Sequence, residues 1–264
     1  LGVSDFTTLR NIQSLEHLDI SRVNLSVLPT EAFLECTNIK SVILPNTLTA
    51  IGTQAFWGSS LVSISIPASV EEIRGSAFFG CSSLKTVTFE KGSKLKTVAG
   101  FSHCTSLTTI EIPASVETIG QYAFNDCTSL HTVTFEKGSK LKTIGSDVFL
   151  NCTSLTMIEI PASVETIEDQ AFEGCSLLAT VTFEKGSQLK TVDGFSNCTA
   201  LTTVDMSACT QVTRIEYRAF YEDSKLQLFK IGTRTPPSCG RNVFTGINSY
   251  SVLKVPAGCV DAYK

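Results

Sequence analysis

The sequence repeats itself about every 23 residues, and this period constrains the fold more than any other feature of the chain. The repeated frame is Ala-Phe-x-x-Cys-x-x-Leu-x-x-Val, as in the run from Ala123 through Cys127 to Val133. A fixed period of this size is typical of a solenoid, because one unit cannot bury its apolar face alone and must stack on its neighbours. A phenylalanine marks each unit: Phe33, Phe56, Phe78, Phe101, Phe124, Phe149, Phe172, Phe195 and Phe220.

One repeat, residues 107–127, shows the expected path of the chain. Ile110 and Ile112 alternate with polar residues, which is the period-two pattern of a strand with one buried face. Pro113 cannot donate to a sheet ladder and therefore ends the strand. A second inward-facing apolar edge follows, and a short helical or irregular turn returns the chain to the next strand. The pattern predicts about nine to ten stacked repeats, with a parallel β-sheet on one face and short or helical turns on the other.

Ten cysteines would normally suggest disulfides, but here most of them follow the repeat. Equivalent side chains in a stacked solenoid lie about 4.8 Å apart, whereas the β-carbons of a disulfide lie about 3.8 Å apart. We therefore expect a ladder of buried free thiols, with disulfides or a metal site as the alternative. Cys239 and Cys259 lie outside the ladder and could pair, which the sequence leaves open. The ladder residues are Cys36, Cys81, Cys104, Cys127, Cys152, Cys175 and Cys198.

Composition argues against several classes of function. The formal net charge is −4 and is spread along the chain, so no nucleic-acid partner is expected. No apolar stretch approaches the roughly 18 residues that span a bilayer, so no transmembrane segment is expected in this chain. The sequence shows no nucleophile–base pair, phosphate-binding loop or metal-ligand spacing, and its histidines, expected to be solvated surface residues, occupy different repeat slots. We therefore predict no enzymatic activity, no metal site and no cofactor.

Residues 112–130 read Ile-Pro-Ala-Ser-Val-Glu-Thr-Ile-Gly-x-x-Ala-Phe-x-x-Cys-x-Ser-Leu, and residues 160–178 repeat this motif in part. The motif resembles the BspA-type leucine-rich repeat family. The closing segments 236–244 and 255–264 resemble the C-terminal part of such proteins from Bacteroides-like bacteria. The resemblance implies a leucine-rich repeat solenoid of the α/β repeat class and a secreted or surface-anchored protein. Some family members are linked to adhesion to host matrix proteins or to other bacteria, and the family has no common catalytic residues.

The whole chain, residues 1–264, is interpreted as a single leucine-rich repeat domain. Residues 1–31 read as a more ordinary leucine-rich repeat, residues 32–231 as BspA-type repeats, and residues 232–264 as a C-terminal capping segment. Residues 1–10 lack the basic start and apolar centre of a signal peptide. Leu1 opens partway through a repeat, and the resemblance implies a secreted or anchored protein, so we expect that a signal or anchor has been removed from this sequence. We also expect a monomeric protein that is extracellular or anchored at the cell surface.

The outward side of the strand sheet is the first candidate binding surface. Threonine and acidic residues share its exposed positions, which would give a flat, hydroxylated and mildly acidic face. The alternative is that β-branched threonine suits an exposed strand and that the acids keep the surface soluble. The positions are Thr86, Thr88, Thr109, Glu111, Thr132, Thr134, Glu159, Thr180, Thr182 and Asp205.

The slot directly after the repeat phenylalanine is the second candidate. Leu34, Trp57 and Phe79 fill it in three successive repeats, whereas Ser102 and Asn125 fill it in the next two. If the slot faces solvent, the first three side chains form an apolar stripe, and such patches mark contact sites. The alternative is that these side chains fold over the edge of the core.

The Phe-Glu-Lys-Gly-Ser loops are a third candidate, because lysines recur in and after them, as at Lys91 and Lys96. Each of these loops also carries a glutamate that offsets the charge, as Glu90 does. Solvated loop ends account for such lysines, and weak ionic contacts with acidic glycans are the alternative.

These patterns support one leading hypothesis and one rival. The leading hypothesis is a non-enzymatic recognition or adhesion module that binds a protein or glycan on host or neighbouring cells. It would bind through the sheet face or the apolar stripe. The rival is a structural spacer that displays another domain and has no ligand of its own.

Overall fold

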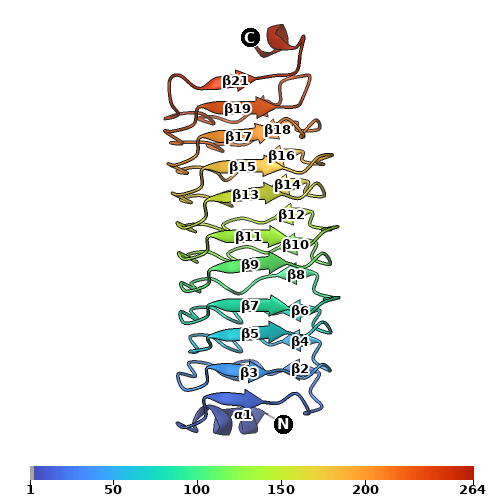
Figure 1. The fold of residues 1–264 in the computed structure, drawn as a ribbon, viewed down its shortest axis with the longest axis vertical. Coiled ribbons are helices and arrows are strands. Elements are labelled where there is room, and N and C mark those ends of the chain that lie inside the picture. The colour runs from blue at the N-terminus through green and yellow to red at the C-terminus, as the bar shows by residue number, and fades with distance from the viewer. Residues whose placement is uncertain (1–2) are drawn as a thin grey trace.

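The computed structural model describes residues 3–264, with side chains described from Asp5 onward, and it shows a single stack of repeats (Figure 1). Each repeat makes one circuit, and consecutive circuits lie one above the other from the N-terminal to the C-terminal end. Parallel sheets of six, ten and five strands run along the stack. The predicted solenoid with a parallel sheet on one face is confirmed. The first two residues of the expected N-terminal segment, residues 1–31, lie outside the described residues.

One face of the stack carries the longer strands, which form two sheets. The six-stranded sheet contains β1 (His17–Asp19), β3 (Ser41–Ile43), β5 (Ser63–Ile66), β7 (Thr86–Phe89), β9 (Thr109–Ile112) and β11 (Thr132–Phe135). The five-stranded sheet contains β13 (Met157–Ile160), β15 (Thr180–Phe183), β17 (Thr203–Met206), β19 (Leu228–Ile231) and β21 (Val252–Lys254). In β9, Ile110 and Ile112 are buried and the two polar residues are exposed, as the alternation predicts.

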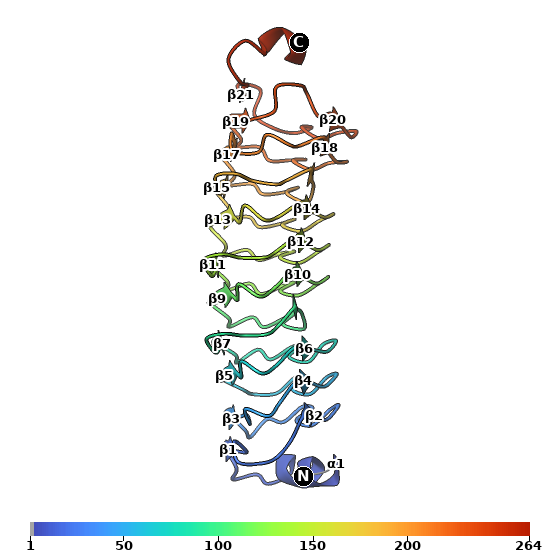
Figure 2. The same ribbon diagram turned by 90° about the vertical axis from the view of Figure 1, so that its right-hand side faces the viewer.

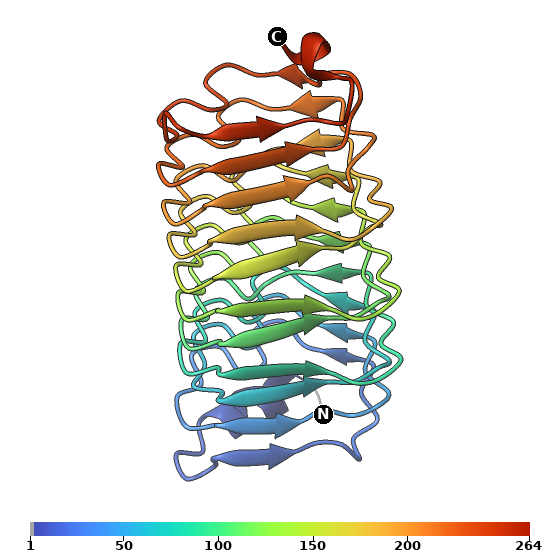
Figure 3. The same ribbon diagram turned by 45° about the horizontal axis from the view of Figure 1, so that its top comes forward.

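A second parallel ladder runs along the opposite side of the stack, behind the longer strands in Figure 3. Its ten strands are β2 (Val27–Leu28), β4 (Ala50–Ile51), β6 (Glu72–Ile73), β8 (Thr97–Val98), β10 (Thr118–Ile119), β12 (Thr143–Ile144), β14 (Thr166–Ile167), β16 (Thr191–Val192), β18 (Arg214–Ile215) and β20 (Ser238–Cys239). The sequence predicted a second set of inward-facing apolar residues here but not a β-sheet. Figure 2 shows the two ladders on opposite sides of the molecule.

The repeat phenylalanine lies in a tight irregular turn that follows each short strand. Most of these turns have two residues in the left-handed region, as Tyr122 (φ 57°) and Asp126 (φ 55°) are on either side of Phe124. The N–H groups of the turn bond to the next repeat, since Phe124 N lies 2.9 Å from Val148 O and Asp126 N lies 2.8 Å from Leu150 O. Consecutive repeat phenylalanines stack with ring centroids 4.8 to 5.6 Å apart. Most consecutive repeats are therefore joined at three places in the circuit, namely the two strand ladders and the turn.

The cysteines form the predicted ladder of buried free thiols. No disulfide occurs in the described part of the chain, which contains every cysteine, and Cys239 and Cys259 are both unpaired. The ladder thiols act as hydrogen-bond donors as well as core residues. Cys127 Sγ lies 3.2 Å from the Phe101 carbonyl oxygen, and most other ladder cysteines make the equivalent contact. Asp223 occupies this slot in the last regular repeat.

The glutamates of the Phe-Glu-Lys-Gly-Ser loops have a structural role. Glu136 Oε2 accepts a hydrogen bond from the Ala114 backbone N–H in the preceding repeat, at 2.9 Å. Glu90 and Glu184 make the equivalent contact at 3.2 and 2.9 Å. These carboxylates satisfy backbone donors that follow the proline at the end of a longer strand, where the sheet ladder stops.

The two ends of the stack are built differently. Helix α1 (Val3–Arg10) lies beneath the first repeat, and Phe6 packs edge-on against Phe33 with ring centroids 5.5 Å apart. The sequence did not predict this helix. At the other end the expected capping segment, residues 232–264, adds β20 and β21 to the two ladders and ends in the 3₁₀ helix η1 (Val260–Tyr263). Neither helix in the described residues has the length and apolar character needed to cross a membrane.

Candidate binding surfaces

The sheet-face residues lie in two columns on the outer side of the longer strands. Strand register aligns Thr86, Thr109 and Thr132 in one column and places Glu111 beside Thr134 in the other. The hydrogen-bonded ladder breaks between β11 and β13, so the face is not continuous. Beyond the break the columns resume with these exposed or half-buried residues: Glu159, Thr180, Thr182 and Asp205.

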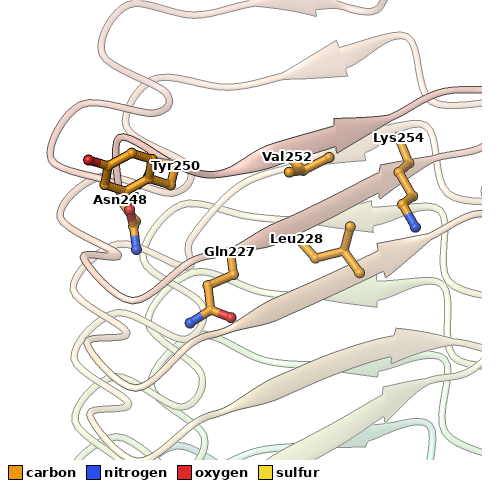
Figure 4. A pocket seen from close by; sticks show the side chains of 6 residues that line it. All are labelled: Gln227, Leu228, Asn248, Tyr250, Val252 and Lys254. Carbon is orange, nitrogen blue, oxygen red and sulfur yellow. Dashed lines mark hydrogen bonds between the residues drawn. The ribbon is translucent and has the colours of Figure 1, made fainter.

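The sheet face changes character near its C-terminal end. Lys230 Nζ lies 2.6 Å from Asp205 Oδ2. Burial acts to raise the pKa of Asp205, but hydrogen bonds from Lys230 and Ser207 hold that pKa below its usual value. Beyond this pair the face becomes more apolar and basic, and the side chains at its open hollow stand apart rather than converging on one point (Figure 4). The hollow has a volume of about 510 Å³ and is lined by Gln227, Leu228, Asn248, Tyr250, Val252 and Lys254.

The apolar stripe of Leu34, Trp57 and Phe79 lies along the turns, and each of these side chains is half-buried. The Trp57 and Phe79 rings stack with centroids 4.1 Å apart and planes at 21°. The His103 ring lies next, 4.9 Å from the Phe79 ring, and its Nε2 is 3.6 Å from Asp126 Oδ2. The structure therefore extends the stripe to a histidine that the sequence analysis had assigned to solvent.

Other large side chains in the turns were missed from the sequence. Leu150 and Tyr221 occupy the same slot as Trp57 and are also half-buried. Both residues directly follow a repeat phenylalanine, and this spacing could have identified them in the sequence. Tyr221 also contacts Arg218, whose guanidinium carbon lies 4.7 Å from the Tyr221 ring centroid and 4.9 Å from the Tyr217 ring centroid.

Part of the lysine set is engaged in ion pairs between repeats. Lys142 and Lys190 both contact Glu165, at 2.9 and 2.6 Å. Their hydrogen bonds, that of Lys190 first, lower the pKa of Glu165 to about 2. Lys96 makes a similar contact with Glu117 at 2.8 Å. These lysines therefore already have carboxylate partners along the side of the stack.

The ladder thiols are poor nucleophiles because they lie in the core. Burial raises the pKa of Cys127 and Cys175 to about 12, so these sulfurs stay protonated at neutral pH. Within residues 3–264, no group of three or more histidine, cysteine, aspartate or glutamate side chains is placed to hold a metal ion. The surfaces described above can bind a partner through apolar packing, hydrogen bonds and ion pairs.

The family model for the BspA type leucine-rich repeat region matches six copies over residues 6–100, 98–227 and 192–261. The chain belongs to the BspA-type leucine-rich repeat family. Repeats of this family are typical of proteins that mediate protein interactions or surface display. No curated protein matches this BspA-type chain significantly.

Solved structures share the architecture. A leucine-rich repeat protein from Bacteroides ovatus aligns with a TM-score of 0.58 at 23% identity, over 88% of this chain and 75% of that chain. The pneumococcal vaccine antigen PcpA aligns with a TM-score of 0.54 at 20% identity, over 92% of this chain and 69% of that chain. At these identities the likeness shows a common fold.

Proposed function

We propose that this BspA-type protein is a non-enzymatic recognition module that binds a partner protein through the apolar stripe. The observation that supports this most is the half-exposed stack of Trp57, Phe79 and His103. The solenoid does not require large rings in this slot, because Ser102 and Asn125 fill it in the next repeats without interrupting the phenylalanine stack. Large apolar side chains kept at a surface without a structural need are typical of contact sites.

The geometry of the stripe favours a protein over a glycan. A sugar ring binds aromatic side chains by lying flat on an open ring face. In the stripe, one face of Trp57 is covered by Phe79, and Phe79 lies between Trp57 and His103. Neighbouring rings therefore cover one face of Trp57 and flank Phe79, which leaves little open ring face for a sugar. Half-exposed aromatic side chains with an adjacent histidine suit the apolar and polar side chains of a protein interface, where tryptophan is a frequent hot spot.

A structural spacer that displays another domain is the second candidate. It is favoured by the unbroken ladder of short strands and by the continuous phenylalanine column, which join each repeat to the next along the stack. A spacer needs no ligand. The two candidates therefore differ in whether the protein shows saturable binding at all.

We further propose that the protein acts outside the cell or anchored at the cell surface, with its partner on host or neighbouring cells. Membership of the BspA-type family supports this location. The structurally similar pneumococcal protein is described as a vaccine antigen, which also supports it.

The test is binding to an immobilised extract of host extracellular matrix. The stripe variant carries Trp57→Ser and Phe79→Ser, since serine already occupies this slot in other repeats. The control variant carries Thr88→Ala and Glu111→Ala on the sheet face. We expect saturable binding by the wild type, at least roughly tenfold weaker binding by the stripe variant, and binding within about twofold of the wild type by the control.

Two other outcomes would contradict binding through the apolar stripe. No saturable binding by the wild type at high micromolar concentration would favour the spacer. Loss of binding only in the sheet-face variant would move the contact to the sheet. Circular dichroism of each variant checks that the fold is kept.

A further inference from the structure

A second departure from the repeat lies near the C-terminal end, in the turn that follows β18. Tyr217 and Arg218, which have no counterparts of the same type in the other repeats, meet Tyr221 there, and Tyr221 fills the slot of Trp57. The guanidinium carbon of Arg218 lies 4.9 Å from the Tyr217 ring centroid and 4.7 Å from the Tyr221 ring centroid. Both distances are within the range of a cation–π interaction. The two rings therefore hold the guanidinium at the outer edge of the turn.

The guanidinium of Arg218 has no carboxylate or carbonyl partner among the described residues. The neighbouring acidic side chains lie toward other groups. Glu216 Oε1 lies 2.8 Å from Arg214 Nε. The carboxyl group of Glu222 lies over Gly246, 2.6 Å from where a β-carbon on that glycine would be. Ring contact leaves the in-plane N–H donors of Arg218 free to bind an oxyanion.

The backbone conformation holds Arg218 in its position before a ligand binds. Arg218 has a φ of 59°, and its N–H lies 3.1 Å from the Arg241 carbonyl oxygen in the next repeat. Gln54 and Gln170 adopt the same left-handed conformation at the same position of their turns. A side chain held in place before binding loses little conformational entropy when a ligand arrives.

We propose that Tyr217, Arg218 and Tyr221 form a clamp that binds the carboxylates of an acidic segment in a partner protein. Arginine binds carboxylates with two parallel hydrogen bonds, and tyrosine with arginine is the composition of protein-interface hot spots. A long sulfated glycan fits less well. Asp169 fills the slot of Tyr217 two repeats earlier and lies within electrostatic reach of Asp193, so a long polyanion that extended along this edge beyond the clamp would be repelled. The clamp is separate from the apolar stripe and goes beyond the function proposed above.

The experiment follows the Nε–Hε resonance of Arg218 by NMR in the wild-type full chain, and the affinity of the wild type and of every variant is measured by isothermal titration calorimetry. The probe is a capped Gly-Glu repeat peptide, compared with the same peptide carrying glutamine and with a heparin-derived tetrasaccharide. Arg218→Gln removes the charge but keeps a residue that this backbone position accepts in two other repeats. Arg218→Lys keeps the charge without the planar fork. Arg234→Gln is the control, since Arg234 is exposed and has no ring contact among the described residues.

We expect the glutamate peptide to shift the Arg218 resonance saturably and the glutamine peptide to leave it unchanged. Affinity should fall by roughly tenfold in Arg218→Gln, by a smaller factor in Arg218→Lys, and not at all in Arg234→Gln. An unchanged resonance, or equal affinity in Arg218→Gln, would overturn the proposal. Stronger binding of the tetrasaccharide at Arg218 would overturn the assignment to a protein. The stripe experiment is independent of all these outcomes.

Discussion

A carboxyl group in the core makes the stability of the C-terminal repeats depend on pH. Asp223 occupies the cysteine slot, and its side chain is fully buried. Its Oδ1 accepts a hydrogen bond from the Cys198 N–H at 2.8 Å, whereas Oδ2 has no hydrogen-bond partner among the described residues. Burial raises the pKa of Asp223 from 3.8 to about 8, although the Cys198 hydrogen bond acts to lower it. The folded protein therefore holds this carboxyl group protonated at neutral pH.

The sign and size of the pH effect on stability follow from the difference between the folded and unfolded pKa values of Asp223. The folded pKa of Asp223 lies above the unfolded value, so unfolding releases a proton at any pH between 3.8 and about 8. Stability is therefore highest at the acid end of this window and falls as pH rises, by about 1.4 kcal/mol per pH unit. At pH 7 the loss amounts to about 4 kcal/mol. Asp223→Asn keeps the shape and the acceptor for Cys198 but cannot ionise. It should match the wild type near pH 4 and exceed it by about 4 kcal/mol at pH 7.

The assay is urea unfolding followed by circular dichroism from about pH 4 to about pH 8. Asp223→Cys restores the residue of the other repeats and serves as a matched control without a carboxyl group. All other titrating groups are shared, so the difference between wild type and variant isolates Asp223. Because neighbouring repeats unfold in succession, the effect should appear first in the C-terminal repeats. Wild-type and Asp223→Asn stability curves that run parallel across this pH range would show that Asp223 has no raised pKa in the folded protein.

Three further predictions concern the core and the loops. Phe149→Ala should lower the free energy of unfolding by about 3 to 5 kcal/mol, because its ring stacks on the phenylalanines of both neighbouring repeats. A loss below about 1 kcal/mol in urea unfolding would show that the column contributes little. Glu136→Ala leaves the backbone N–H of Ala114 without its hydrogen-bond acceptor and should lower the free energy of unfolding by about 1 kcal/mol. Glu136→Gln keeps an acceptor and should lower it by less. In the native protein a thiol reagent such as DTNB should react rapidly only with the exposed Cys239, and with all ten cysteines after denaturation. Rapid labelling of several native thiols would contradict the buried ladder.

The stack itself could be predicted because every repeat carries the same signal. The alternation around Ile110 and the recurrence of Phe124 and Cys127 identified the core residues that the structure shows. The short ladder could not be predicted as a sheet. A strand such as β10 pairs through only two residues, which is too few for a period of two to be recognised. Helix α1 was missed for a related reason, since its eight residues span barely two turns of helical periodicity.

The candidate sites were only partly visible in the sequence. Trp57 and Phe79 stood out because they break the repeat. The addition of His103 to their stack could not be foreseen, because it comes from the next position of the turn. A φ of 58° at this residue accompanies the approach of its ring to Phe79. The clamp around Arg218 was missed because its members occupy three different positions of one turn, and only the folded chain shows that they meet.

The proposed contact between the apolar stripe and a partner protein can be tested directly at Trp57. Trp57 is the only tryptophan of the chain, so replacing it with 5-fluorotryptophan places a single fluorine reporter in the stripe. The ¹⁹F resonance is measured while solubilised host-matrix proteins are added, with binding followed in parallel on the same samples. We expect a saturable shift or broadening of this resonance that follows the bound fraction and persists in the sheet-face control variant. Saturable binding with an unchanged resonance would contradict it.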